Sequence, residues 1–144
     1  MKVFFDTSVL VAAVVQPHPM HSRAVSWLKR TKKREIEFFV ASHTLAELYA
    51  VLTTLPVSPR ITPGTAWRLV HENVETAANI ISLSPSEYRA TIKRIAELGL
   101  SGGLIYDALI AKAAQKSGAD CLLTFNADDF KLVWPEGQNL VSVP

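Results

Sequence analysis

The sequence predicts an α/β fold, a three-layer α/β/α arrangement around a mostly parallel sheet of about five short strands. Short runs of Val, Phe, Ile and Leu alternate with helical stretches along the chain. Strands that alternate with helices pair in parallel through crossovers, and the helices then cover both faces of the sheet. Because the runs are rich in Val, Phe, Ile and Leu, they are typical of strands that are buried on both faces.

The length and composition predict one domain, residues 1–144. The chain has 144 residues, of which 49% are hydrophobic and 19% are charged. These values suit one ordinary globular core and exclude a disordered chain. No repeat period and no low-complexity segment divides the sequence.

Strands are expected where β-branched, aromatic and other apolar residues gather in short runs. The predicted strands are Lys2–Phe5, Ile36–Ala41, Asn79–Leu83, Asp120–Phe125 and Leu140–Val143.

The predicted helices begin at capping residues or prolines and end at glycines or prolines. They cover an apolar stretch capped by Thr7 or Ser8, residues 21–33, Ser42 or Thr44 to about 55, 62 to about 78, 84–99 and 104–117. Between the last two strands, only one helical turn is expected, directly after the fourth strand.

The net charge of +2 is too small to identify a partner. Basic residues nevertheless cluster at the end of the second predicted helix, at Lys29, Arg30, Lys32, Lys33 and Arg34. Two interpretations stay open: a solvated helix end whose cations oppose the helix dipole, or a surface that contacts phosphates.

A cytoplasmic protein without membrane association is expected. The chain has no run of about 20 apolar residues that would form a membrane span. Asp6 interrupts the apolar N-terminal stretch, and no cleavage motif of a secretory signal follows it. The only cysteine, Cys121, excludes an internal disulfide and is expected to be a small buried residue.

Carboxylates follow the predicted strands at the edge where ligands gather in open parallel sheets. Asp6 ends the first strand, and Glu47 lies in the first turns of the helix after the second. Asp107 lies in the first turns of the helix before the fourth strand, and Asp128 and Asp129 follow that strand. We therefore expect these acidic segments to converge at one edge of the sheet.

Each acid also has a structural interpretation. Asp6 is a residue type that caps helices, and Glu47 matches the last position of a capping box that Thr44 opens. Asp107 would interact favourably with the N-terminus of its helix. The acids after the fourth strand are individually expected to be solvated.

The combination of acids favours a metal site. Several carboxylates at one edge repel each other unless protons or a divalent cation compensate their charge. Oxygen ligands without cysteines or clustered histidines favour Mg²⁺ or Mn²⁺ over zinc. Such sites activate water and stabilise developing charge in phosphoryl chemistry.

Other catalytic motifs are missing from the sequence. It contains no glycine-rich phosphate loop and no Gly-x-Ser-x-Gly segment. His18, His21, His43 and His71 have no paired nucleophile motif, and we expect them to be exposed or locally hydrogen-bonded.

Four segments, in order, resemble the motifs of PIN domains, particularly the VapC toxins of prokaryotic toxin–antitoxin pairs. The segments are residues 3–11 around Asp6, 42–48 around Glu47, 104–111 around Asp107, and 123–130 near the C-terminus. Together they span nearly the whole chain.

The resemblance implies endonucleolytic cleavage of RNA by water that Mg²⁺ or Mn²⁺ activates. Asp6, Glu47 and Asp107 would be the catalytic, metal-binding acids, and Asp129 would complete the metal site. The neighbouring polar residues would be Thr7, Ser8, Thr124 and Asn126. The resemblance also implies a cognate antitoxin partner and a homodimer.

The sequence departs from the family pattern at Asn126, where many relatives have an acid. Asp129, or with less support Asp128, would substitute for it. Two alternative functions stay open, a catalytically degenerate PIN-like binding module and a DNA- or structure-specific nuclease.

Overall fold

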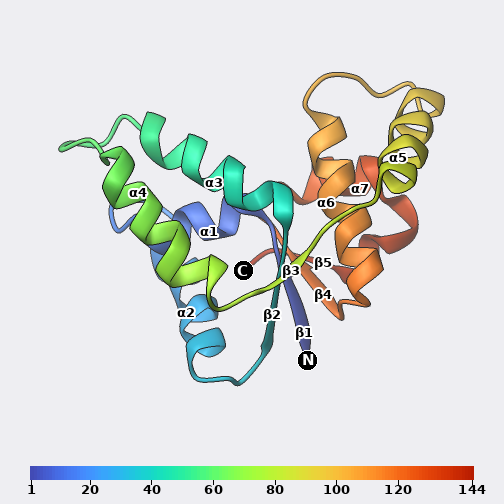
Figure 1. Ribbon diagram of the computed structural model, residues 1–144. Helices are drawn as coiled ribbons and strands as arrows, with labels where there is room; N and C mark the ends of the chain where they lie inside the picture. The colour runs from blue at the N-terminus through green and yellow to red at the C-terminus, as the bar shows by residue number, and fades with distance from the viewer.

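A computed structural model describes residues 1–144 and contains one parallel five-stranded sheet (Figure 1). The strands are β1 (Lys2–Phe5), β2 (Glu37–Ala41), β3 (Asn79–Ile81), β4 (Cys121–Leu123) and β5 (Val141–Ser142). They are arranged in the order β3-β2-β1-β4-β5, and every neighbouring pair is parallel. The predicted α/β/α fold is confirmed, with strands somewhat shorter than the sequence suggested.

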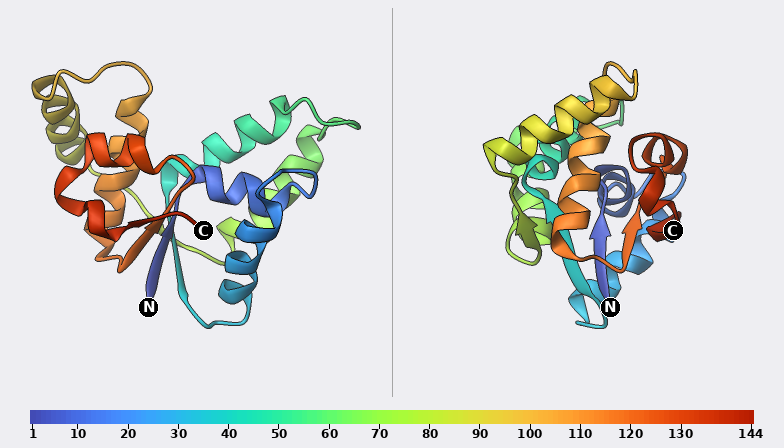
Figure 2. Two further views of the ribbon diagram at one scale, coloured as in Figure 1. Left: turned by 180° about the vertical axis from the view of Figure 1, so that it is seen from behind. Right: turned by 90° about the vertical axis from the view of Figure 1, so that its right-hand side faces the viewer.

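Helices cover both faces of the sheet, as the two views of Figure 2 make clear. One layer contains α1 (Thr7–Val14), α2 (His21–Lys32), α3 (Ser42–Thr54) and α4 (Pro63–Val70), which continues as a π-helical turn, His71–Glu75. The other layer contains α5 (Pro85–Glu97), α6 (Leu104–Ser117), α7 (Ala127–Val133) and a 3-10 segment, Pro135–Leu140. Each layer packs its own hydrophobic cluster against the sheet.

The central strand β1 is buried on both faces. Val3 and Phe5 belong to the cluster beneath α1 to α4, whereas Phe4 belongs to the cluster beneath α5 to α7. All three side chains are fully buried, and burying one such side chain stabilises the fold by roughly 1.5–3 kcal/mol. The strand is thus a rigid base for Asp6, the residue that follows it.

Helix α1 starts one or two residues earlier than predicted. It begins at Thr7, and Asp6 occupies the N-cap position without a side-chain capping bond. The prediction that Thr7 or Ser8 caps this helix is therefore wrong. Because both residues lie inside the first turn, their hydroxyl groups are available for contacts elsewhere.

Helix α7 extends further than the single turn that was expected after the fourth strand. It buries Phe130 and Val133, and Trp134 follows directly. Gly137 lies so close to the Trp134 ring that a Cβ atom there would be 2.0 Å from it. Seven residues hold too few apolar positions for a periodic signal, so tertiary packing defines this helix.

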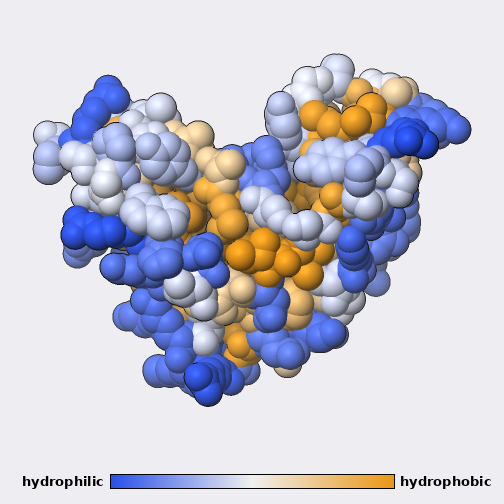
Figure 3. Space-filling view, viewed as in Figure 1, coloured by the Kyte–Doolittle hydropathy of each residue, from blue (hydrophilic) through white to orange (hydrophobic).

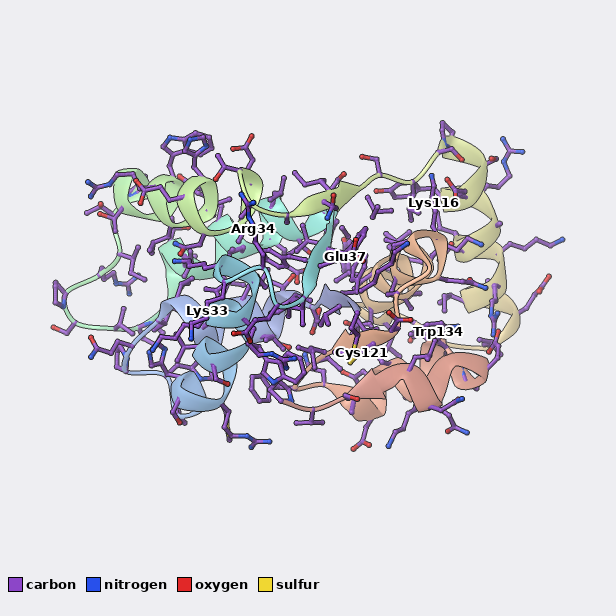
Figure 4. The ribbon with its side chains drawn as sticks, turned by 90° about the horizontal axis from the view of Figure 1, so that it is seen from below. Lys33, Arg34, Glu37, Lys116, Cys121 and Trp134 are labelled. Carbon is purple, nitrogen blue, oxygen red and sulfur yellow. The ribbon has the colours of Figure 1, made fainter.

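The basic cluster lies at the other edge of the sheet from the carboxyl ends of the strands. Figure 4, viewed from below, shows Lys33 and Arg34 beside Glu37, where β2 begins. Arg30 stacks over the Trp27 ring, 4.5 Å from its centroid, so part of the cluster is engaged locally. Of the two interpretations of the basic cluster, the structure supports a solvated helix end.

Cys121 is less buried than the sequence predicted. It is half-buried at the start of β4, and burial raises the pKa of its thiol. None of the helices combines the length and apolar character that crossing a bilayer requires.

Candidate active site

The strands β1, β2 and β4 end at a hollow between the helical layers. In Figure 1, β1 and β2 run toward the gap between α3 and α6, and the surface in Figure 3 is hollowed between its two lobes. A cavity of about 660 Å³ opens at this edge. Its lining includes Asp6, Glu47, Asp107, Thr7, Ser8, Arg23, Phe125 and Asn126. The structure therefore brings the three predicted carboxylates to one cavity.

Asp6 is held by two hydroxyl groups. Ser8 Oγ donates to Asp6 Oδ2 at 2.7 Å, and Thr124 Oγ1 donates to the same oxygen at 2.8 Å. Each hydroxyl in turn accepts a backbone N–H of the segment after β4, Ser8 from Phe125 and Thr124 from Asn126. The network locks this carboxylate to the end of β4.

Burial makes the charge of Asp6 unfavourable. Its side chain is 2% exposed, and this burial is the main reason that its pKa is raised above the ordinary value. The hydrogen bonds from Ser8 and Thr124 act in the opposite direction, and the charge of Glu47 adds to the increase. No cation forms a salt bridge with Asp6.

Thr7 makes a different contact from Ser8. Its Oγ1 donates to Thr44 Oγ1 at 3.4 Å, inside the interface between α1 and α3. Both threonines are buried. This contact fixes α3, the helix that carries Glu47, against α1.

Glu47 lies in the second turn of α3 and is paired with His43 at i,i+4 spacing. The distance from His43 Nε2 to Glu47 Oε2 is 3.1 Å. The capping box that Thr44 and Glu47 would form is not present, because α3 already begins at Ser42. Glu47 instead directs its carboxylate toward the cavity rim beside Asp6 and Asp107.

Asp107 lies in the first turn of α6 and has no salt bridge. Its pKa is raised from 3.8 to about 7. Burial is the largest cause, followed by the charges of Asp6, Asp129 and Glu47. Near neutral pH this carboxyl is thus only partly ionised, because nothing in the protein compensates its charge.

The segment after β4 adds further oxygen atoms at the cavity edge. Asn126 precedes α7 and lines the main cavity. Asp129 lies in the first turn of α7 and lines an adjoining hollow with Asn126 and Asp128. Since the charge of Asp129 contributes to the raised pKa of Asp107, Asp129 faces the acidic site more closely than Asp128 does.

The donors at this edge suit a hard divalent cation in kind, since carboxylate, amide and hydroxyl oxygens surround the cavity. No three carboxylate, imidazole or thiol groups converge closely enough to form a finished ligand set. Asp6 and Asp107 are the residues that could hold an ion, with Glu47 and Asp129 at the margin. Because these four carboxylates repel one another, a compensating positive charge is needed to bring them close around one ion.

Two neighbours of the site were not singled out from the sequence. Arg23, near the start of α2, is the one Lys or Arg residue that lines the cavity. Its Nε donates to the carbonyl oxygen of Pro144 at 2.8 Å, and its guanidinium lies 5.8 Å from the Phe125 ring centroid. No local signal predicts this placement, because it depends on how α2 packs. The His43–Glu47 pair was detectable from its i,i+4 spacing.

Comparison with known proteins agrees with this arrangement. Residues 3–133 match the PIN domain family. The chain is 35% identical over 115 residues to ribonuclease VapC27 of Mycobacterium tuberculosis, which covers 80% of this chain and 78% of that protein.

Two solved structures have the same fold. A structure of VapBC2 from Rickettsia felis, bound to a DNA fragment from their promoter, has a TM-score of 0.68 at 21% identity, covering 99% of this chain and 98% of that one. Mycobacterium tuberculosis VapC20, a sarcin-ricin loop cleaving toxin, has a TM-score of 0.67 at 16% identity, covering 88% and 92%. The resemblance seen in the sequence is confirmed: this chain belongs to the PIN domain family.

Proposed function

We propose that this chain is a metal-dependent endoribonuclease, the toxin of a toxin–antitoxin pair, with Asp6, Glu47 and Asp107 as its catalytic acids. The observation that carries the proposal is the uncompensated charge at the cavity, where Asp107 has a pKa of about 7 and no salt bridge. The ribonuclease relative at 35% identity supports the choice of RNA as substrate.

Mg²⁺ or Mn²⁺ is the proposed cofactor. When bound, such an ion lowers the pKa of water and neutralises charge on the phosphodiester. Asp6 and Asp107 would hold it, and Asp129, whose charge contributes to the raised pKa of Asp107, would complete the site. Asp6 suits the role of fixed ligand, because Ser8 and Thr124 hold it in one orientation and leave it no freedom to turn away.

Glu47 is proposed to orient the attacking water. The contact with His43 Nε2 restrains the Glu47 side chain at the cavity rim. Arg23 provides the cation for a non-bridging phosphate oxygen, because no other Lys or Arg lines the cavity. Asn126 adds an amide that can donate a hydrogen bond to the substrate or to water.

The experiment is a cleavage assay with the purified chain on total RNA, followed by mapping of the fragment ends. Cleavage that needs Mg²⁺ or Mn²⁺, stops with a chelator and is lost in Asp6→Ala supports the proposal. Equal cleavage of a matched single-stranded DNA would favour a DNA-directed nuclease. Failure to cleave RNA with either metal would overturn the proposal in favour of a degenerate binding module.

The remaining parts of the proposal concern assembly. A cognate antitoxin is the proposed protein partner, and a homodimer is the proposed oligomeric state. The cytoplasm is the proposed location. Affinity purification of the tagged chain from its own cells, followed by identification of any small protein bound to it, would test the first, and light scattering of the purified chain would test the second.

A further inference from the structure

Two aromatic rings stack next to Glu47 and Asp107, outside the lining of the main cavity. The rings of His43 and Tyr106 are parallel, with an interplanar angle of 1° and centroids 5.1 Å apart. Tyr106 directly precedes Asp107 in α6, and His43 precedes Glu47 by one turn in α3. The stack therefore connects the two helices that carry two of the three acids.

The two rings differ in how they are held. His43 is anchored, since its Nε2 lies 3.1 Å from Glu47 and its side chain is 29% exposed. Tyr106 is 50% exposed and takes part in no side-chain hydrogen bond through its hydroxyl group. One face of the tyrosine ring is thus covered by an anchored histidine, and much of the ring remains open to solvent.

The electrostatics of the site make an aromatic contact useful for an anionic substrate. The carboxylates repel phosphates, and Arg23 is the only Lys or Arg at the cavity. The basic cluster around Lys33 and Arg34 lies at the other edge of the sheet (Figure 4). An aromatic contact beside the acids would add affinity for a nucleic acid that does not depend on pairing cations with phosphates.

We infer that Tyr106, backed by His43, is a stacking platform for a nucleobase of single-stranded RNA beside the cleaved phosphodiester. The inference rests on the proposed function. Aromatic side chains stack on any base through its π face, and one such contact contributes roughly 1–3 kcal/mol by alanine substitution. The platform would hold the strand at the acids without selecting strongly among bases.

The test measures RNA binding in the Asp6→Asn background, so that bound RNA is not cleaved. The probe is a short fluorescent single-stranded RNA, and its Kd is measured by anisotropy with and without Mg²⁺. Tyr106→Leu should raise Kd by roughly 5- to 150-fold. Tyr106→Phe keeps the ring and should bind like the parent.

Tyr49→Leu is the matched control, since Tyr49 is 40% exposed on α3 and forms no aromatic pair. It should leave Kd unchanged. A second arm replaces each base of the probe in turn with an abasic residue. At one position the abasic probe should bind the Tyr106 parent weakly, and Tyr106→Leu should add no further loss.

Equal RNA affinity of Tyr106→Leu and the parent would overturn the inference, and the rings would then be better explained as a contact for a protein partner. An abasic scan in which no position matters would also overturn it, and this arm needs no substitution at Tyr106. The cleavage assay of the native chain judges the proposed function separately, because these binding measurements require no turnover.

Discussion

Two acids at opposite ends of the α5–α6 pair have pKa values that are shifted in opposite directions. The helices are joined at the top of Figure 1, so Glu87 at the start of α5 lies beside the end of α6, far from Asp107. Glu87 accepts the Ser84 N–H at 2.9 Å and Lys116 Nζ at 2.7 Å, and these contacts lower its pKa to about 2. Asp107 has no such partners, and its pKa is raised to about 7.

The contrast separates an acid that a nearby cation neutralises from one whose charge the fold leaves uncompensated. Both residues lie in the first turn of a helix, where the dipole favours negative charge, so the dipole alone does not explain the difference. Lys116 neutralises Glu87, whereas Asp107 faces Asp6, Glu47 and Asp129. Under the proposed function, this uncompensated repulsion would favour the binding of a cation beside Asp107.

The largest expected effect is on catalysis. Asp6→Asn or Asp107→Asn should lower RNA cleavage by more than roughly 100-fold, since even the outer partners of metal ligands cost roughly 10- to 100-fold when removed. The melting temperature should stay the same or rise, because each variant removes a repelling charge.

The matched control is Asp128→Asn, which changes an exposed acid in the first turn of α7, next to Asp129. It should retain cleavage within a few-fold. Cleavage rates beside thermal melts give the comparison, and a folded Asp107→Asn variant with full activity would remove Asp107 from the proposed mechanism.

The second effect is a pH dependence of stability in the metal-free protein. The pKa of Asp107 in the folded state, about 7, exceeds its ordinary value of 3.8. The unfolded chain therefore binds fewer protons between these values, and the contribution of this group is present below pH about 4 and lost as pH rises through about 7.

Thermal melts in chelator across this range should show a steeper loss of stability for the native chain than for Asp107→Asn. Mg²⁺ should raise the melting temperature more at pH 8 than at pH 5, because protons and metal compete for the same carboxylates. Parallel pH curves for the two proteins would show that Asp107 is not the uncompensated group.

A smaller effect concerns the metal requirement. Asp129→Ala should raise the Mg²⁺ concentration for half-maximal cleavage, and Asn126→Ala should raise it less, because an amide attracts a divalent ion more weakly than a carboxylate. The charge that Asp129 exerts on Asp107 supports this order. Metal titrations of the two variants measure it, and an unchanged requirement in Asp129→Ala would exclude Asp129 from the site.

The sequence predicted the acidic edge because the acids sit where strands end and helices begin, which are local signals. It did not predict which Ser/Thr-x-x-Glu segment forms a capping box. At Ser84 the following Pro85 fixes the first helical turn, and the box forms with Glu87. At Thr44 the helix starts earlier, and the buried hydroxyl contacts Thr7 instead.

Tertiary packing explains the other features that the sequence left undetermined. Arg23 reaches the cavity only because α2 packs with its first turn toward the end of the chain, where Pro144 accepts its hydrogen bond. Helix α7 is defined by the burial of Phe130 and Val133 and by Trp134 after them. Both depend on contacts between segments far apart in the sequence, and neither leaves a periodic pattern.

The smallest expected effect tests the neutralised acid of the comparison. Glu87→Gln keeps an oxygen for the Ser84 N–H but loses the charge that attracts Lys116, so the melting temperature at pH 7 should fall by roughly 1–3 °C. The pKa of Glu87 in the folded state, about 2, lies below its ordinary value of 4.5. Its contribution is therefore present above pH 4.5 and lost as pH falls toward 2, so the two proteins should melt alike near pH 2.

The control is Glu97→Gln, on the same helix, where an exposed side chain has a 3.8 Å contact with Lys93. Its melting temperature should change less. Cleavage should be unaffected in both. A Glu87→Gln variant that melts higher than the native chain at pH 7 would place Glu87 with Asp107 among the uncompensated acids and break the contrast.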